Sequence, residues 1–121
     1  MKMTTNIRRL GFVTIVDIRG RIVFGQEIES LRASVRELLS EGHKRVLFNL
    51  SNVDYIDTSG IGYLVSALTS VRNRGGELKL VNPNKKAQEL IEATKLDRIL
   101  EVMNDEAAAV SSFGESAAAT A

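Results

Sequence analysis

The sequence contains no cysteine, no tryptophan and one histidine among its 121 residues. The absence of cysteine excludes disulfide bonds, cysteine-ligated zinc sites and thiol catalysis. Because His43 is the one imidazole in the sequence, any metal site that needs two histidines is excluded as well. We therefore expect neither a bound metal ion nor a cofactor.

The sequence also has little net charge, because 16 basic residues stand against 15 acidic ones and leave +1 at pH 7. Proteins that bind nucleic acid or an anionic membrane surface usually carry a clear basic excess. This balance gives no reason to expect either kind of partner, and we expect no nucleic acid to be bound.

Long apolar runs are absent too, since none approaches the ~18 residues that a membrane-spanning helix needs, and no membrane insertion is expected. The N-terminal segment superficially resembles a secretion signal, because Lys2, Arg8 and Arg9 precede an apolar run. Asp17 and Arg19 interrupt that run, which alternates as a strand does. We expect a cytoplasmic protein.

Length and composition, with 44% hydrophobic and 26% charged residues, indicate one globular domain with a modest core. Helix and strand patterns extend over residues 10–113, which we assign to this domain. Residues 1–9 precede the dense apolar pattern and are expected to be a flexible segment. Residues 114–121 offer nothing large to bury, so a frayed tail is expected there.

Two strands are expected to open the domain. Residues 12–18 are rich in β-branched side chains, which favours a strand. Arg19-Gly20 can supply a turn, and residues 22–24 can then resume as the antiparallel partner of the first strand. The sequence therefore predicts a hairpin whose turn lies at residues 19–20.

From residue 26 onward, helical and strand periods alternate. The strand at residues 46–50 is almost wholly apolar, which is typical of a central strand covered on both faces. The expected elements are helix 26–40, strand 46–50, helix 61–72, strand 78–81, a helix that begins at residues 82–84 and ends near Thr94, strand 99–103, and a last helix capped by Asp105. This order predicts an α/β fold, a single domain with a mixed, mostly parallel sheet and helices packed on it.

The helix after residue 60 has an apolar stripe at the spacing i, i+3, i+4, i+7, i+10, which predicts its buried face. The members of this stripe are Ile61, Leu64, Val65, Leu68 and Val71. Tyr63 lies largely off the stripe, so the start of this helix is expected to offer an apolar and aromatic surface.

The chain is organised around residues 50–62, where a buried strand feeds a helix through Asp-Thr-Ser-Gly. The free N–H groups and the dipole at a helix N-terminus favour anions, including phosphate. Thr58 or Ser59 can instead simply cap the helix, since Ser and Thr are preferred cap residues. Gly60 and Gly62 are poor helix formers, which makes sense if the backbone stays open to an approaching partner.

Catalysis by this loop has little support. A serine nucleophile at Ser59 would need His43, which lies in a turn that precedes the strand, at the opposite edge of the sheet. Residues 60–62 are too short for a dinucleotide fingerprint, and no P-loop lysine follows them. Asp54 and Asp57 could pair as carboxylates, but capping or turn formation explains them better. We expect a protein that is not an enzyme.

The stretch at residues 49–62 resembles the signature of STAS-domain anti-sigma factor antagonists, which combines apolar, acidic, hydroxyl and glycine positions. The expected order of strands and helices also resembles that family over about residues 10–113. Residues 72–78 and 94–100 look like further family segments. The resemblance implies a single STAS domain, with the signature loop at the N-terminus of its second helix.

The resemblance implies a protein switch. Members of the family bind a cognate anti-sigma factor, usually a serine kinase, and so release a sigma factor. The kinase phosphorylates the hydroxyl residue directly before glycine, which is Ser59 here, with Thr58 as the second choice, and a serine phosphatase reverses the reaction. The residues expected to bind the partner are Asp54, Asp57, Thr58, Ser59, Gly60, Ile61, Gly62 and Tyr63.

Other functions stay open at this point. Residues 20–25 replace an acidic segment that many family members carry, so the partner is expected to differ from those of the best-known members. One alternative is a STAS scaffold or regulatory subunit of a signalling or transport complex without obligatory phosphorylation. Another is a small nucleotide-binding or hydrolytic enzyme, which the missing P-loop and the missing base for Ser59 make a poor fit.

Overall fold

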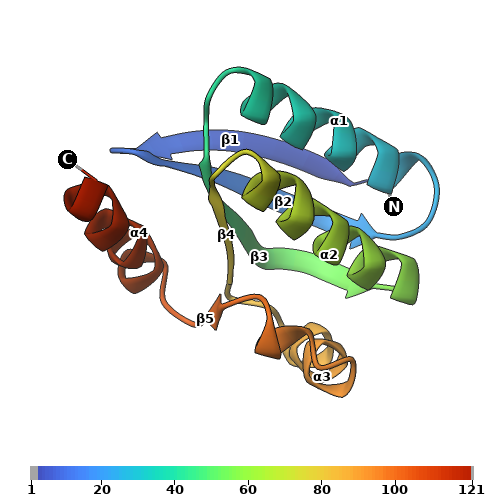
Figure 1. Ribbon diagram of the computed structural model, residues 1–121. Coiled ribbons are helices and arrows are strands. Elements are labelled where there is room, and N and C mark those ends of the chain that lie inside the picture. The colour runs from blue at the N-terminus through green and yellow to red at the C-terminus, as the bar shows by residue number, and fades with distance from the viewer. Residues whose placement is uncertain (1–2, 121) are drawn as a thin grey trace.

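The computed structural model describes residues 3–120, which form one five-stranded sheet, four α-helices and a short 3₁₀ turn (Figure 1). The strands are β1 Thr4–Leu10, β2 Val13–Ile22, β3 Arg45–Ile56, β4 Glu77–Val81 and β5 Val102–Met103. The helices are α1 Gln26–Ser40, α2 Thr58–Asn73, α3 Lys85–Ala93 and α4 Glu106–Thr120, with the 3₁₀ turn at Leu96–Arg98. The strand order is β1-β2-β3-β4-β5, and only β1 runs antiparallel to its neighbour in this sheet. The mixed, mostly parallel sheet predicted from the sequence is confirmed.

The hairpin that opens the domain lies earlier than the sequence pattern indicated. β1 pairs with β2 from Thr4 opposite Arg19 to Leu10 opposite Val13. The turn is at Gly11, whose φ of +61° suits glycine. The expectation that residues 1–9 form a flexible segment is therefore wrong for residues 4–9, and residues 1–2 lie outside the described range.

The expected turn at residues 19–20 lies inside a continuous strand. β2 runs through to Ile22, and its pairing with β3 shifts register on both sides of Gly20. Gly20 has a φ of +101° but does not reverse the chain. At both register shifts the extra residue lies on β3, which is therefore the bulged strand. The separate strand expected at residues 22–24 is also wrong, because the chain leaves the sheet after Ile22.

β3 is the central strand, with β2 and β4 as its parallel neighbours, and it is longer than residues 46–50. Val46, Phe48 and Leu50 are fully buried in the larger part of the core, together with apolar residues of α1, α2 and α3. Leu47 points to the opposite face, because side chains alternate along a strand. Both faces of β3 are thus covered, as its unbroken apolar run predicted.

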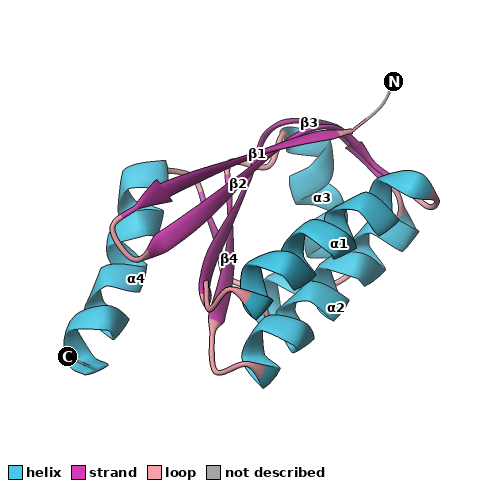
Figure 2. Cartoon of the chain, turned by 90° about the horizontal axis from the view of Figure 1, so that it is seen from above, coloured by secondary structure: helices cyan, strands magenta, loops and turns pink. Residues whose placement is uncertain are grey.

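The helices form one layer on each face of the sheet (Figure 2). α1 and α2 lie together on one face, and α4 covers the other with Ala109 and Phe113. Asp105 caps α4 as expected, since its carboxylate accepts a hydrogen bond of 2.9 Å from the Ala108 N–H. α4 extends to Thr120, and the frayed tail expected at residues 114–121 stays a prediction. Residue 121 lies outside the described range.

Gly60 allows α2 to start very close to the sheet. A Cβ atom at this position would collide with the Ile22 carbonyl oxygen and would lie 2.7 Å from Cγ2 of Ile56. At Gly62 an added Cβ would meet nothing within 4 Å. Gly60 is therefore required for packing, and an open backbone explains only Gly62.

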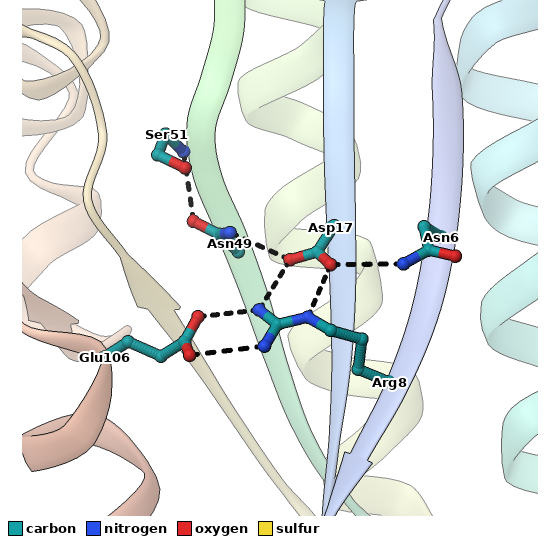
Figure 3. Close-up of polar contacts among 6 residues, drawn as sticks. All are labelled: Asn6, Arg8, Asp17, Asn49, Ser51 and Glu106. Carbon is teal, nitrogen blue, oxygen red and sulfur yellow. Dashed lines mark hydrogen bonds and ion pairs between the residues drawn. The ribbon is translucent and has the colours of Figure 1, made fainter.

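Arg8 connects the edge of the sheet to α4 (Figure 3). Its guanidinium donates to both carboxylate oxygens of Asp17, at 2.6 and 2.9 Å, and to Glu106 at 2.7 Å. Asn49 donates a further hydrogen bond of 2.8 Å to Asp17. The hydrogen bonds from Arg8 hold the pKa of Asp17 below its usual value. This network links β1, β2, β3 and α4 through one partly buried cation.

We expect Gly60→Ala to destabilise the protein by about 2 kcal/mol, because the new methyl group must displace the backbone of β2 or the start of α2. The matched variant Gly62→Ala should be neutral or stabilising by up to about 1 kcal/mol, since alanine favours the helix and has room there. Urea denaturation of both variants measures the difference. Equal effects from the two substitutions would contradict the packing role of Gly60.

Replacing Arg8 with methionine should lower the free energy of unfolding at pH 7 by about 1–2 kcal/mol, the scale of a partly exposed, charge-assisted pair. Because the pKa of Asp17 is lowered in the folded protein, this stabilisation is present above about pH 4 and is lost as the pH falls through the folded-state pKa. Urea denaturation between pH 7 and pH 2.5 should show the gap to wild type closing in acid. Arg9→Met, next to it on β1, is the control and should show no such closing between pH 5 and pH 2.5. A pH-independent gap for Arg8→Met would count against the ion pair.

Candidate functional site

Asp57 fixes the start of α2. Its backbone is extended, and its Oδ1 accepts a hydrogen bond of 2.7 Å from the Gly60 N–H. Its Oδ2 accepts a second hydrogen bond, of 3.2 Å, from the N–H of Phe24 in the connection between β2 and α1. The cap is thus Asp57, and the alternative that Thr58 or Ser59 caps the helix is wrong. One carboxylate joins the first turn of α2 to the segment that leads into α1.

Thr58 and Ser59 are the first two residues of α2, and both are exposed. Successive residues of a helix are rotated by about 100°, so the two hydroxyls face different surroundings. Ser59 lines a groove between α1 and α2. Thr58 instead lines a hollow toward α3, beside Lys86 and Leu90. The structure therefore separates two hydroxyls that are neighbours in the sequence.

The groove beside Ser59 has a volume of about 390 Å³. We call it the Ser59 groove. Its walls are formed by Phe24, Gly25, Ile28, Glu29 and Arg32 on one side and by Ser59, Gly62, Tyr63 and Ser66 on the other. Phe24, at its rim, is 80% exposed. The groove combines an exposed aromatic ring, a free hydroxyl and an arginine.

Tyr63 lies under this groove and is only 4% exposed. Burial raises the pKa of its phenol. Arg32 lies over the ring, with its Cζ atom 5.3 Å from the ring centroid, and donates a hydrogen bond of 3.3 Å to Ser66. The expectation that Tyr63 offers an aromatic surface beside the core is wrong, because α2 packs against α1 as well as against the sheet. For the same reason Val65, expected in the core, is 37% exposed.

The other residues expected to bind a partner divide by exposure. Asp54 is exposed near the end of β3, whereas Ile61 is 7% exposed and belongs to the core. Both Asp57 carboxylate oxygens accept hydrogen bonds from backbone N–H groups, those of Gly60 and Phe24, which agrees with the capping role expected for Asp57. The exposed members of the expected set are Asp54, Thr58, Ser59 and Gly62.

His43 does not approach Ser59. It precedes β3, whereas Ser59 follows that strand, so the twelve residues of β3 separate them. Its ring contacts Arg9, with 2.8 Å between the Arg9 Nη1 and the His43 Nδ1 atoms. A Ser59–His43 catalytic pair is therefore excluded, as the sequence indicated. Among residues 3–113, whose side chains the structure describes, no three acidic or histidine side chains are grouped closely enough to hold a metal ion.

Phe24 and Arg32 are site residues that the sequence patterns missed. Phe24 was assigned to a strand because it follows two apolar residues, although Gly25 directly after it is a signal for a turn. Arg32 lies on the polar face of α1, and nothing in its spacing distinguishes it from Arg36.

None of the helices described is both long and apolar enough to pass through a membrane.

Comparison with known proteins gives consistent matches. A protein of Thermotoga neapolitana, provisionally named an anti-sigma factor antagonist, is 38% identical over 66 residues, or 54% of this chain and 58% of its own length. The anti-sigma-B factor antagonist of Listeria monocytogenes is 38% identical over 58 residues, which cover 48% of this chain and 51% of that protein. The match thus spans little more than half of each relative.

A solved structure and a family model lead to the same family as these relatives. The crystal structure of an anti-sigma factor antagonist from Thermotoga maritima, also provisionally named, superposes with a TM-score of 0.83 at 26% identity. The superposition covers 89% of this chain and 92% of the Thermotoga maritima protein in that structure. The model of the STAS domain matches residues 4–109, from the first residue of β1 into α4. The chain belongs to the STAS domain family.

Proposed function

We propose that this protein is an anti-sigma factor antagonist controlled by phosphorylation of Ser59. The unphosphorylated form binds an anti-sigma factor that is also a serine kinase, and a sigma factor is released. Phosphorylation of Ser59 by that kinase stops the binding, and a serine phosphatase restores it. The names of the relatives from Thermotoga and Listeria support the class of partner. The protein then acts in the cytoplasm, and no catalysis of its own is needed.

The observation that carries this proposal is the placement of Ser59. Its hydroxyl is exposed in the first turn of α2 and faces the Ser59 groove, whereas Thr58 faces α3. In the transfer, the Ser59 Oγ forms a bond to the γ-phosphorus of ATP, ADP leaves, and the hydroxyl proton goes to a base of the kinase. The Thr58 hydroxyl would require the kinase to approach from the side of α3.

A phosphate on Ser59 is compatible with the fold. It adds a charge of about −1.5 to −2 at pH 7, and the N-terminus of a helix favours such a charge. The cap does not need to change, because Asp57 keeps its hydrogen bonds to Gly60 and Phe24. The modification therefore acts on the surface and not on the core.

The Ser59 groove supplies the contact surface. Aromatic side chains that enter a pocket of the partner commonly dominate a protein interface. Phe24 is 80% exposed and is held next to Ser59, because its N–H is bonded to the Asp57 cap. A phosphate at Ser59 would therefore lie directly beside this ring. A loss of about 3 kcal/mol in that interface weakens binding by roughly 150-fold, which is enough for a switch.

We expect the cognate kinase and ATP to place one phosphate on this protein, at Ser59. Ser59→Ala should abolish incorporation, and the matched variant Thr58→Ala should retain it, because the two hydroxyls face different sides of α2. Mass spectrometry of the digested protein locates the phosphate. A phosphate on Thr58, or unchanged incorporation in Ser59→Ala, would refute the assignment.

Phe24→Ala should weaken binding of the unphosphorylated protein to its anti-sigma factor by about 10-fold or more, as the loss of an aromatic anchor does. Its thermal midpoint should change little, since the ring is exposed. Phe12→Ala is the control, because Phe12 is 72% exposed at the β1–β2 hairpin, away from the Ser59 groove. Isothermal titration calorimetry compares the three proteins, and equal losses in both variants would argue against this surface.

A further inference from the structure

The Ser59 groove contains a cationic side chain whose contacts in the unmodified protein are weak. Among the residues that line it, Arg32 is the basic one, and it comes from α1, opposite Ser59. We propose that Arg32 receives the phosphate of phosphorylated Ser59, so that the phosphoserine closes the groove against α1. This inference rests on the proposed function, since it describes what the modified residue does.

Arg32 and Ser59 line the same groove from opposite helices. α1 follows β2, and α2 follows β3. Because these two strands are parallel, both helices begin at the same end of the sheet (Figure 1). Ser59 lies one turn before Tyr63 on the same side of α2, about 6 Å along the axis. The Cζ atom of Arg32 is 5.3 Å from the Tyr63 ring centroid. Ser66, which Arg32 now contacts, lies about 10 Å beyond Ser59 along the α2 axis. The long Arg32 side chain therefore has to rotate toward the helix N-termini to meet a phosphate on Ser59.

The present contacts of Arg32 are easily exchanged. Its Nε atom is 3.5 Å from the carboxylate of Glu29, whose side chain is 70% exposed, and its other contacts are the neutral Ser66 hydroxyl at 3.3 Å and the face of the Tyr63 ring. Exposed ion pairs of this spacing on a helix contribute only a few tenths of a kcal/mol. A phosphate carries up to twice the charge of a carboxylate and accepts two parallel hydrogen bonds from a guanidinium. The phosphate should therefore displace Glu29 as the partner of Arg32.

The other charged groups around Ser59 make this cation more important. Glu27 and Glu29 lie in the first turn of α1, and the Asp57 carboxylate lies at the start of α2. All three repel a phosphate. The N-terminus of α1 partly offsets them, because its cap residue Gly25 has no side chain to satisfy the first N–H groups. Arg32 is thus the mobile positive charge that can neutralise the phosphoserine inside the groove.

Closure of the groove would give the switch a second component. A phosphoserine that reaches from α2 to Arg32 passes over Gly62, where the structure has open space, and covers Tyr63. It then fills the volume beside Phe24 that the partner uses. Binding would be lost through occupation of the groove as well as through repulsion. An aspartate at this position is too short to reach Arg32, so Ser59→Asp should be a weak mimic of the phosphorylated state.

The test uses protein with phosphoserine inserted at position 59 during translation, so that no kinase is needed. Phosphorus NMR follows the second ionisation of the phosphate in the wild-type background, in Arg32→Gln and in the matched control Arg36→Gln. Arg36 lies one turn further along α1 and does not line the Ser59 groove. We expect the titration midpoint to be lower in wild type than in Arg32→Gln by roughly half to one pH unit, as for a neighbouring opposite charge. Arg36→Gln should stay close to wild type.

Two results would overturn the inference. One is a midpoint in Arg32→Gln equal to that of wild type, and the other is an equal shift in Arg36→Gln, which would indicate only a general field. Arg32→Lys keeps the charge and should give an intermediate midpoint, so it replaces Arg32→Gln if the latter unfolds. Failure of the cognate kinase to modify Ser59 would overturn the proposed function and leave this result standing. If the kinase modifies Ser59 but the phosphate titrates with the same midpoint in wild type and in Arg32→Gln, the proposed function stands and this inference fails.

Discussion

The site depends on the two hydrogen bonds accepted by the Asp57 carboxylate. One oxygen holds the Gly60 N–H and starts α2, and the other holds the Phe24 N–H and sets the path into α1. Since β2 and β3 end side by side, a single short side chain can span both connections. The exposed hydroxyl of Ser59 and the exposed ring of Phe24 are therefore placed relative to one another by the same group.

The helices on the two faces of the sheet are held by separate sets of contacts. On one side α1 and α2 pack on the larger cluster of the core, and the Ser59 groove opens between their first turns. On the other side α4 is held by Phe113 and by the Arg8 network with Asp17 and Glu106. Gly60 matters for the first face, because it allows α2 to approach Ile22 closely. A charge added at the exposed Ser59 would thus lie outside the packed core.

Sequence patterns located most elements because the information for them is local. Helix 26–40 and the cap at Asp105 follow from residues within a few positions of one another. The hairpin was misplaced because two glycines, Gly11 and Gly20, could each have made the turn. Only the pairing of β1 with β2 distinguishes them, and that pairing is a long stretch of backbone contacts that leaves little trace in composition.

The sequence alone shows the signature at residues 49–62, in which a strand leads into a helix through Asp-Thr-Ser-Gly. It also indicates the family and limits the candidate hydroxyls to Ser59 and Thr58. Which way each hydroxyl faces, the burial of Tyr63 and the position of Arg32 across from Ser59 could not be read in this way. They follow from the packing of α1 against α2, two helices separated by all of β3. A periodic pattern reports that a helix has a buried side, but it does not say which neighbour covers that side or which side chain of the neighbour lies opposite.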